Sequence, residues 1–551
     1  GAALMWEMAT RNAAMAKLLL QTTVVSTLVR MMGIYRKAAI QAPLMSTYLH
    51  LLAADKEAAA LQMIHDAVIE ACSISLKAFA LSAEVVAPCV EVLIELVRFK
   101  ESHEKMLTVP LLPDLVAVIG QEGQDEHIQC RCVKLMKKLV FLPRSTLALG
   151  SVGDLKVVVA VMRLMLKRDK KTLMKAMRVV LESLRRADLY ENIRASLLPE
   201  AICEVLLHYT GDKAIEEKSI ETMSLLVAHA EPTHECFIRR DVISIIVDNM
   251  RVYYESEALT MACCKTLAFL SKYAEVVDYL AIMNIAKLVL YSMQTYKDGE
   301  NVMYCAQVVM NTGSNEQCVG QWVQSETVQL LLRLCEEYIK KEETLFALTA
   351  ALYVLAKSEV SHASFGAGDC VSVFTSVLDV WMNRNNDEIL CNVLLTVFYC
   401  YKVEAVLAAL KRSTLLDLII RVVVANLSKA LAKAYAMLMC RLAEDASLRP
   451  VLLAKRALEP LLDCVRKFPK GKTVNADGFR AMELMSSEAE AKEFLLDNNV
   501  LYECMEAIKN HLYAVEVLLP AVDVIAIIEQ FAVEDGQTSA VKQRDICEYV
   551  V

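Results

Sequence analysis

A short apolar motif recurs along the whole 551-residue chain at intervals of about 43 residues, and this spacing limits the possible folds more than any other feature. The motif has the form I-P-x-L-V with substitutions, and its first residues are Val25, Val68, Leu112, Leu155, Leu198, Ile243, Ile285, Val328, Val371, Leu415, Leu458 and Leu501. No interval departs from the mean by more than about two residues. The spacing predicts a solenoid of stacked repeats.

The pattern inside each repeat is typical of helices. Apolar residues follow the motif three and four places on, as Leu331 and Leu332 do after Val328, and so lie on one helix face. A polar turn comes next, and then a longer helix of about 15 residues is expected, for example over Ser219 to Ala228 or Thr344 to Ala356. Pro113, Pro199 and Pro460 fall near motif starts, where the first turn of a helix tolerates proline. The sequence predicts an all-α chain.

Composition excludes several other classes of protein. The chain is 56% hydrophobic, but its apolar runs, such as Leu155 to Leu166, are short and contain charges, whereas a membrane-spanning helix needs about 20 apolar residues. The 15 Gly and 11 Pro are spread thinly and form no linker. These features predict a soluble, cytoplasmic protein without membrane insertion.

The 18 cysteines are typical of reduced core thiols. Several lie singly in apolar helical stretches, namely Cys203, Cys335, Cys370, Cys391, Cys440 and Cys464. The close pairs Cys130/Cys132 and Cys263/Cys264 lack partner pairs at the spacing of a zinc site. A secreted disulfide scaffold is a much shorter chain, so we expect neither disulfides nor a bound metal.

The repeat resembles the armadillo repeat, most clearly in the segments Gly120 to Val140 and Lys341 to Ala356. The resemblance covers essentially the whole chain and implies a right-handed α-solenoid of about 12 repeats. Each repeat would contain a short helix and two longer ones, the last of which lines a concave groove. HEAT-like repeats, which have an overlapping period, are the alternative.

Both ends of the chain carry partial repeats. The segment Ala2 to Ala9 is typical of the last helix of a repeat, and a new motif begins near Ile546. We therefore expect one continuous solenoid over 1–551, with a partial first repeat at 1–33 and regular repeats at 34–511. The remaining segment, 512–551, would hold a last groove helix and the start of a truncated repeat, so that the chain is a segment of a longer array.

The groove positions argue against one known armadillo function. Importin-alpha-type proteins carry a repeated Trp and, four residues later, an Asn, which clamp a basic peptide. By alignment, none of the Trp positions here holds tryptophan, and only Asn311 matches the Asn position. A nuclear-signal clamp is therefore not expected, although Asn311 remains a candidate groove residue.

Two neighbouring groove helices carry basic residues at helical spacing. They are Arg131, Lys134 and Lys138 on one helix, and Lys171, Lys175, Arg178 and Arg185 on the next. A basic strip on a chain of net charge −8 favours an acidic or phosphorylated segment as partner, and the arrangement resembles the basic groove of beta-catenin-type proteins. The alternative is that these charges are only the solvated face of amphipathic helices. Nucleic acid is disfavoured, because no aromatics alternate with the strip.

The sequence offers no catalytic constellation. The pairs Gly150/Gly153 and Gly366/Gly368 lack the setting of a phosphate loop, and His229 to Cys236 is expected to be an exposed interhelical loop. The prediction is therefore a non-catalytic protein-binding scaffold or adaptor in a larger, cytoskeletal or ciliary, assembly, with no cofactor and no small-molecule substrate. A chaperone or transport-type cargo receptor is the alternative function.

Overall fold

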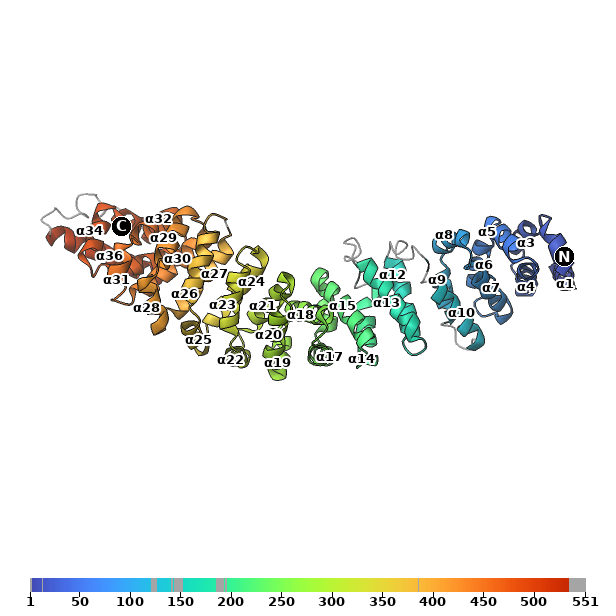
Figure 1. Cartoon of the computed structure of the whole chain (residues 1–551). Coiled ribbons are helices and arrows are strands. Elements are labelled where there is room, and N and C mark those ends of the chain that lie inside the picture. The colour runs from blue at the N-terminus through green and yellow to red at the C-terminus, as the bar shows by residue number, and fades with distance from the viewer. Residues whose placement is uncertain are drawn as a thin grey trace. The chain divides into compact units, whose positions relative to one another are not determined.

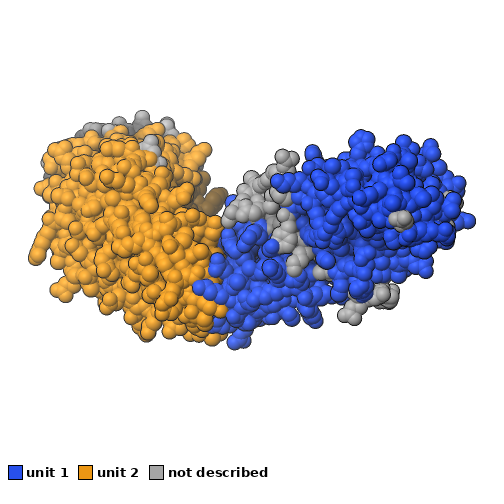
Figure 2. All heavy atoms as spheres, turned by 45° about the vertical axis from the view of Figure 1, so that its right-hand side comes forward, with its two compact units in different colours: residues 1–249 blue, residues 250–551 orange. Residues whose placement is uncertain are grey.

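The computed structural model describes residues 2–11, 13–119, 126–139, 142, 152–184, 193, 196–384 and 386–534. Helices joined by short turns make up this part of the chain, and it contains no strand. Two compact units are present, Gly1–Asn249 and Met250–Val551 (Figure 2). The predicted all-α solenoid is confirmed, whereas a single uninterrupted array over 1–551 stays a prediction.

The helices of the first unit follow one another in the order seen in Figure 1. They are α1 (Ala2–Arg11), α2 (Ala13–Leu20), α3 (Val24–Ile34), α4 (Ala38–Ala54), α5 (Lys56–His65), α6 (Val68–Ala78), α7 (Ala83–Leu96), α8 (Lys100–Thr108), α9 (Leu111–Ile119), α10 (Glu126–Leu139), α12 (Val152–Met165), α13 (Lys170–Leu184), α14 (Leu198–His208), α15 (Lys213–His229), η3 (Glu231–Thr233) and α16 (His234–Phe237). The boundary between the units falls within α17 (Arg240–Val252).

The second unit continues the same order of helices. They are α18 (Glu257–Leu270), α19 (Ala274–Met283), α20 (Ala286–Thr295), α21 (Gly299–Thr312), α22 (Glu316–Gln324), α23 (Thr327–Glu337), α24 (Glu342–Ala356), η4 (Glu359–Ser361), α25 (His362–Ala367), α26 (Cys370–Trp381), α27 (Asp387–Cys400), α28 (Glu404–Arg412), α29 (Leu415–Ala425), α30 (Lys429–Ala443), α31 (Arg449–Ala454), α32 (Leu458–Lys467), α33 (Lys472–Met485), α34 (Ala489–Asp497), α35 (Val500–Asn510) and α36 (Val515–Glu534). The predicted last groove helix is α36, while the motif near Ile546 lies outside the described residues.

A complete repeat has three helices, as in α22, α23 and α24. The first is short, the second begins with the apolar motif, and the third is longer. Three helices per repeat match the armadillo-like prediction and not the two-helix HEAT-like alternative. No single helix in the described ranges is long and apolar enough to span a membrane, although three bent helix pairs reach the required length and composition together.

The third helices pack against one another in sequence order. Within the second unit, α18, α21, α24, α27, α30, α33 and α36 each contact the next, and within the first unit α1, α4, α7 and α10 do so. The apolar residues of the motif bury one face of each second helix, as Leu331 and Cys335 of α23 show. The opposite face of the helix is left free. Each repeat is therefore buried mainly by its neighbours.

In many repeats the turn between the first and second helices is closed by a residue with left-handed backbone. Among the described residues, seven residues other than glycine have a positive φ, each one or two positions before a second helix: Ala67, Leu197, Asn284, Glu326, Asp369, Arg456 and Asn499. A positive φ reverses the direction of the chain within a single residue. It carries a steric cost, so it persists only where tightly packed surroundings hold the backbone in that conformation. This turn recurs with the 43-residue period although the residue type does not.

The ends of several second helices are fastened to the preceding repeat by a side-chain donor. Tyr338 Oη donates to the carbonyl of Lys297 at 2.8 Å, and Trp381 Nε1 donates to the carbonyl of Ile339 at 2.6 Å. We call this set the inter-repeat donors; it comprises Tyr209, Tyr296, Tyr338, Trp381, Asn426 and Lys467. Each partner carbonyl lies about one period earlier in the chain, so every such bond joins two consecutive repeats.

In three of the described repeats, the turn between the third and the first helix is closed by a Ser or Thr followed by His. Ser361 Oγ donates to the carbonyl of Leu355 at 2.6 Å, and His362 Nε2 lies 2.9 Å from the carbonyl of Ala356. Ser102 and His103 make the same pair of contacts. In the third case His234 is buried at the start of α16, 2.8 Å from the carbonyl of Val227. The expectation of an exposed loop at His229 to Cys236 was therefore wrong, because this segment forms a short first helix.

None of the cysteines that the structure describes forms a disulfide. Of the six predicted core thiols, four are buried (Cys203, Cys335, Cys370, Cys464) and two are half-buried (Cys391, Cys440). Burial raises the pKa of Cys203 and of Cys132 to about 12. Cys130 is exposed.

Removing one inter-repeat donor tests the stacking of repeats. Tyr338→Phe keeps the ring but leaves the Lys297 carbonyl without its donor, and we expect the free energy of unfolding to fall by about 1 kcal/mol in urea denaturation. The control is Tyr513→Phe, since Tyr513 is 98% exposed. Equal midpoints for the two variants would contradict the proposed fastening.

The buried thiols should make the fold sensitive to alkaline pH. The pKa of Cys132 and that of Cys203 lie above the usual value in the folded state, so these thiols stay protonated there but ionise in the unfolded chain above about pH 8.5. The unfolded chain then binds fewer protons, and the free energy of unfolding falls as pH rises towards the folded pKa values. Urea denaturation at about pH 7.5 and about pH 9.5 measures this loss. Maleimide labelling of the native protein should modify Cys130 well before Cys132 or Cys203, and equal labelling rates would disprove their burial.

Candidate protein-binding surfaces

The predicted basic residues lie on third helices of the first unit. On α10, Lys134 is exposed while Arg131 and Lys138 are half-exposed. On α13, Lys171 and Arg178 are exposed and Lys175 is half-buried. The predicted Arg185 lies outside the described residues.

A hollow of about 580 Å³ runs over three successive third helices at this place. Its lining comes from α4 (Leu49), α7 (Glu91, Ile94, Glu95) and α10 (His127, Cys130, Arg131, Lys134). The third helices thus provide a surface that crosses repeat boundaries, as expected for the groove side of such a repeat.

Carboxylates on α7 pair with part of the basic strip. Arg131 Nη1 lies 2.5 Å from Glu91 Oε1, and Arg131 Nη2 lies 2.8 Å from His127 Nε2. Glu95 Oε2 is shared by Lys56 at 2.6 Å and Arg98 at 2.8 Å. The sequence-based site omitted Glu91, Glu95, His127, Lys56 and Arg98. Glu91 nevertheless precedes Lys134 by one period and so falls at the equivalent position of the preceding repeat.

Cations outnumber carboxylates once the residues beside the hollow are counted with its lining. Arg131 and Lys134 line the hollow together with Glu91 and Glu95, and among the described residues Lys56, Arg98 and Lys138 lie beside these carboxylates. Lys138 donates to the carbonyl of Ile94 at 3.3 Å. Burial lowers the pKa of Lys138, and the nearby charges of Arg98, Lys134 and Lys56 lower it further. The site is therefore electropositive even after its internal ion pairs are formed.

Asn311 lies on α21 in the second unit and uses its amide within the chain. Its Nδ2 donates to the carbonyl of Ala268 at 2.8 Å and to Ser271 Oγ at 3.0 Å. It also lines a hollow of about 470 Å³ with Lys272, Asp278 and Asn315 among others. The amide thus links α21 to the end of α18, and any ligand in this hollow would meet an amide that is already engaged.

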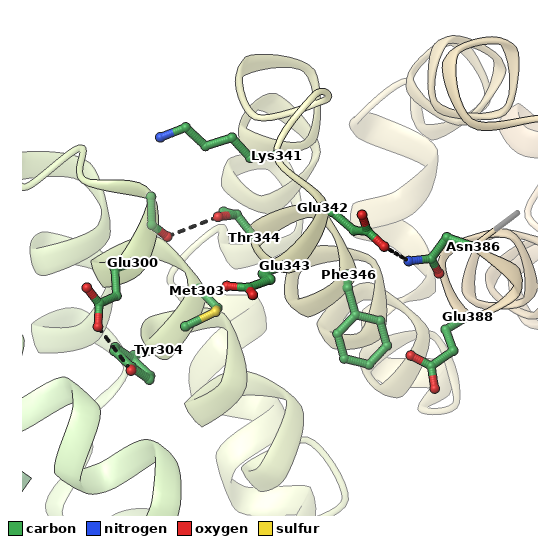
Figure 3. A pocket seen from close by; sticks show the side chains of 11 residues that line it. Glu300, Met303, Tyr304, Lys341, Glu342, Glu343, Thr344, Phe346, Asn386 and Glu388 are labelled. Atoms are coloured by element: carbon green, nitrogen blue, oxygen red, sulfur yellow. Dashed lines mark hydrogen bonds between the residues drawn. The ribbon is translucent and has the colours of Figure 1, made fainter. Parts of the chain in front are cut away.

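A larger hollow, of about 820 Å³, lies over α21, α24 and α27 of the second unit (Figure 3). Its lining residues are Gly299, Glu300, Met303, Tyr304, Lys341, Glu342, Glu343, Thr344, Phe346, Asn386 and Glu388. Four carboxylates and one amine give it the opposite charge to the hollow on α10. These residues give no distinctive signal in the sequence, because first-turn carboxylates are ordinary at helix starts.

The remaining side chains offer no metal site among the described residues, where no group of three or more His, Cys, Asp or Glu converges. The tryptophans Trp322 and Trp381 are buried and hydrogen-bonded to Thr312 and Ile339. They contribute to the core rather than to the third-helix surface. The hollow on α4, α7 and α10 and the hollow on α21, α24 and α27 both present polar and charged groups on a surface that extends over several repeats.

No protein-family model matches the chain, and no curated protein matches it. Among solved structures, the one described as "A conserved phosphorylation switch controls the interaction between cadherin and beta-catenin in vitro and in vivo" matches with a TM-score of 0.58 and 11% identity, covering 95% of this chain and 99% of that chain. UNC-45 from Drosophila melanogaster has a TM-score of 0.47 and 14% identity over 98% of this chain and 74% of its own. An engineered protein has a TM-score of 0.43 and 14% identity over 73% and 94%. Of these three structures, the first has a TM-score above 0.5. At 11% identity this likeness shows the fold alone, an armadillo-like helical-repeat solenoid.

Proposed function

We propose that this chain is a non-catalytic scaffold or adaptor that binds an extended acidic or phosphorylated segment of a partner protein along α7, α10 and α13. The observation that carries the proposal is the excess of cations over carboxylates around the hollow on α4, α7 and α10. A repeat fold alone does not specify a partner, so we infer the partner from the chemistry of this surface.

The arrangement of the cations favours an extended ligand over a single small anion. The cations of the basic strip lie on two third helices, Arg131, Lys134 and Lys138 on α10 and Lys171, Lys175 and Arg178 on α13. An extended segment reaches several of them in succession, at about 3.3 Å per residue. Arginine also recognises carboxylate and phosphate with two parallel hydrogen bonds, which Arg131 and Arg178 are able to offer.

The similar solved structure agrees with this choice of partner. Its description names a phosphorylation switch in the interaction between cadherin and beta-catenin. By analogy, we propose that phosphorylation of the partner strengthens its binding to this chain. The proposal places the complex in the cytoplasm, as part of a larger cytoskeletal or ciliary assembly.

Charge reversal at exposed cations tests the proposal. In Lys134→Glu/Arg178→Glu, both changed side chains are exposed, so the core is untouched. We expect binding of a fluorescein-labelled peptide, in which aspartate and phosphoserine alternate with glycine, to weaken roughly tenfold or more. Fluorescence anisotropy measures the affinity, and circular dichroism should show an unchanged helical melting curve.

The matched control is Lys77→Glu/Lys156→Glu. It changes the net charge equally but places both exposed side chains on second helices. This control should bind the peptide almost as well as the wild type. If both double variants lose affinity equally, the attraction comes from net charge alone and the proposed site is wrong. Pull-down with the same pair of variants, followed by mass spectrometry, then shows which cellular partner depends on the strip.

A further inference from the structure

The hollow on α21, α24 and α27 has a rim held in place by the chain itself. Thr344 Oγ1 donates to the carbonyl of Gly299 at 3.1 Å, which joins the start of α24 to the start of α21. Asn386 Nδ2 donates to Glu342 Oε1 at 2.7 Å, which joins α27 to α24 (Figure 3). A hollow whose rim is fixed in this way loses little conformational entropy when a ligand enters.

Two of its four carboxylates are engaged and two are not. Glu300 accepts from Tyr304 Oη at 3.1 Å, and Glu342 accepts from Asn386. Among the described residues, neither Glu343 nor Glu388 forms an ion pair or a hydrogen bond. The amine of Lys341 does not neutralise them, because its chain extends away from Glu343 and Glu388 in Figure 3. The hollow thus presents two free negative charges.

Aromatic rings provide the second half of the site. Tyr304 and Phe346 both line the hollow, and Phe346 is half-exposed. Lys265 Nζ lies 5.2 Å from the centre of the Tyr304 ring, so this ring already carries a cation of the chain. Within the described residues, no lysine or arginine lies over the ring of Phe346. A cation on that ring would have to come from another molecule.

The same third helices show how this chain places cations on rings. Lys357 Nζ lies 4.3 Å from the centre of the Tyr353 ring on α24, and the Arg441 guanidinium lies 5.7 Å from that of Phe398 on α27. Such contacts contribute about 0.5 to 1 kcal/mol when exposed and more when desolvated. In each case the cation comes from the chain itself, whereas the hollow combines an uncovered ring with unpaired carboxylates.

The acidic groups are not explained by helix starts alone. First-turn carboxylates do stabilise the N-terminus of a helix. However, the third helices α30 and α33 begin without any acidic residue in the first turn. A single first-turn carboxylate is found in α15, α18 and α21, whereas α24 and α27 carry two each, and the hollow and the rings lie at these helices. Burial, followed by Glu300 and Glu343, raises the pKa of Tyr304, which agrees with a negative local field.

We propose that this hollow binds an arginine or lysine side chain of a partner polypeptide, with the cation over Phe346 and between Glu343 and Glu388. The site lies on other helices and has the opposite charge to the surface of the proposed function, so the inference goes beyond that function. Arginine fits best, because its planar guanidinium stacks on a ring and donates several hydrogen bonds to carboxylates at the same time.

A local probe tests the site directly. Met303 lines the hollow, so its ¹³C-labelled methyl group reports on occupancy, and Met303→Leu assigns its signal among the 26 methionines. We expect N-acetyl-arginine amide to shift the Met303 signal with a saturable dependence on concentration. N-acetyl-citrulline amide, which has the same shape but no charge, should leave the signal in place.

Two variants separate the site from general acidity. Glu343→Gln/Glu388→Gln should weaken the arginine probe about tenfold, since it removes both unpaired charges and keeps the shape. Glu404→Gln/Glu490→Gln removes two exposed first-turn carboxylates of α28 and α34 and should bind like the wild type. Phe346→Leu should also weaken the probe. An equal response to citrulline, no response of Met303, or equal affinity of the two carboxylate variants would overturn the proposal, whatever the result for the basic strip.

Discussion

The packing of each third helix on the third helix of the next repeat is the contact on which the rest of the structure depends. A single repeat has too few apolar residues to bury its own motif, so Leu331 and its equivalents become a core only when repeats stack. Hydrogen bonds such as Tyr338 to the Lys297 carbonyl fix the rotation between neighbours. Because the period is constant, residues about 43 positions apart lie at equivalent places on successive repeats.

Because one face of each third helix packs in the core, the other face is free to vary in charge. Core positions of α24 such as Leu348 and Leu352 are buried, whereas Glu343 and Phe346 line the hollow. Substitution at such positions costs little stability, since exposed charges rarely contribute more than about 1 kcal/mol. Within one fold, the first unit therefore presents a basic hollow on α10 and the second an acidic hollow on α24.

The sequence was sufficient to predict the second helices and the armadillo-like repeat, because their apolar residues recur with both the helical and the repeat period. It was not sufficient for the turns. The inter-repeat donors are Tyr, Trp, Asn or Lys, which share only an ability to donate, so no single residue type reveals them. The basic residues of α10 are evident from helical spacing, but the pairing of Arg131 with Glu91 depends on the rotation of α7 against α10. Likewise, predicting the acidic hollow requires the side-chain directions in three separate repeats.

The internal ion pairs of the basic hollow bear on which anion it selects. Arg131 and Glu91 are 29% and 40% exposed, so their pair is only weakly stabilising and a ligand is able to compete for the guanidinium. A partner carboxylate gains little by the exchange, because it replaces one single negative charge with another. A phosphoserine carries about −1.5 to −2 charges and three acceptor oxygens, so it gains more from Arg131 and Lys134 than Glu91 does. Because Glu91 and Glu95 already pair with cations of the basic hollow, a partner needs more than a single negative charge to displace them. This favours a phosphorylated segment over a merely acidic one.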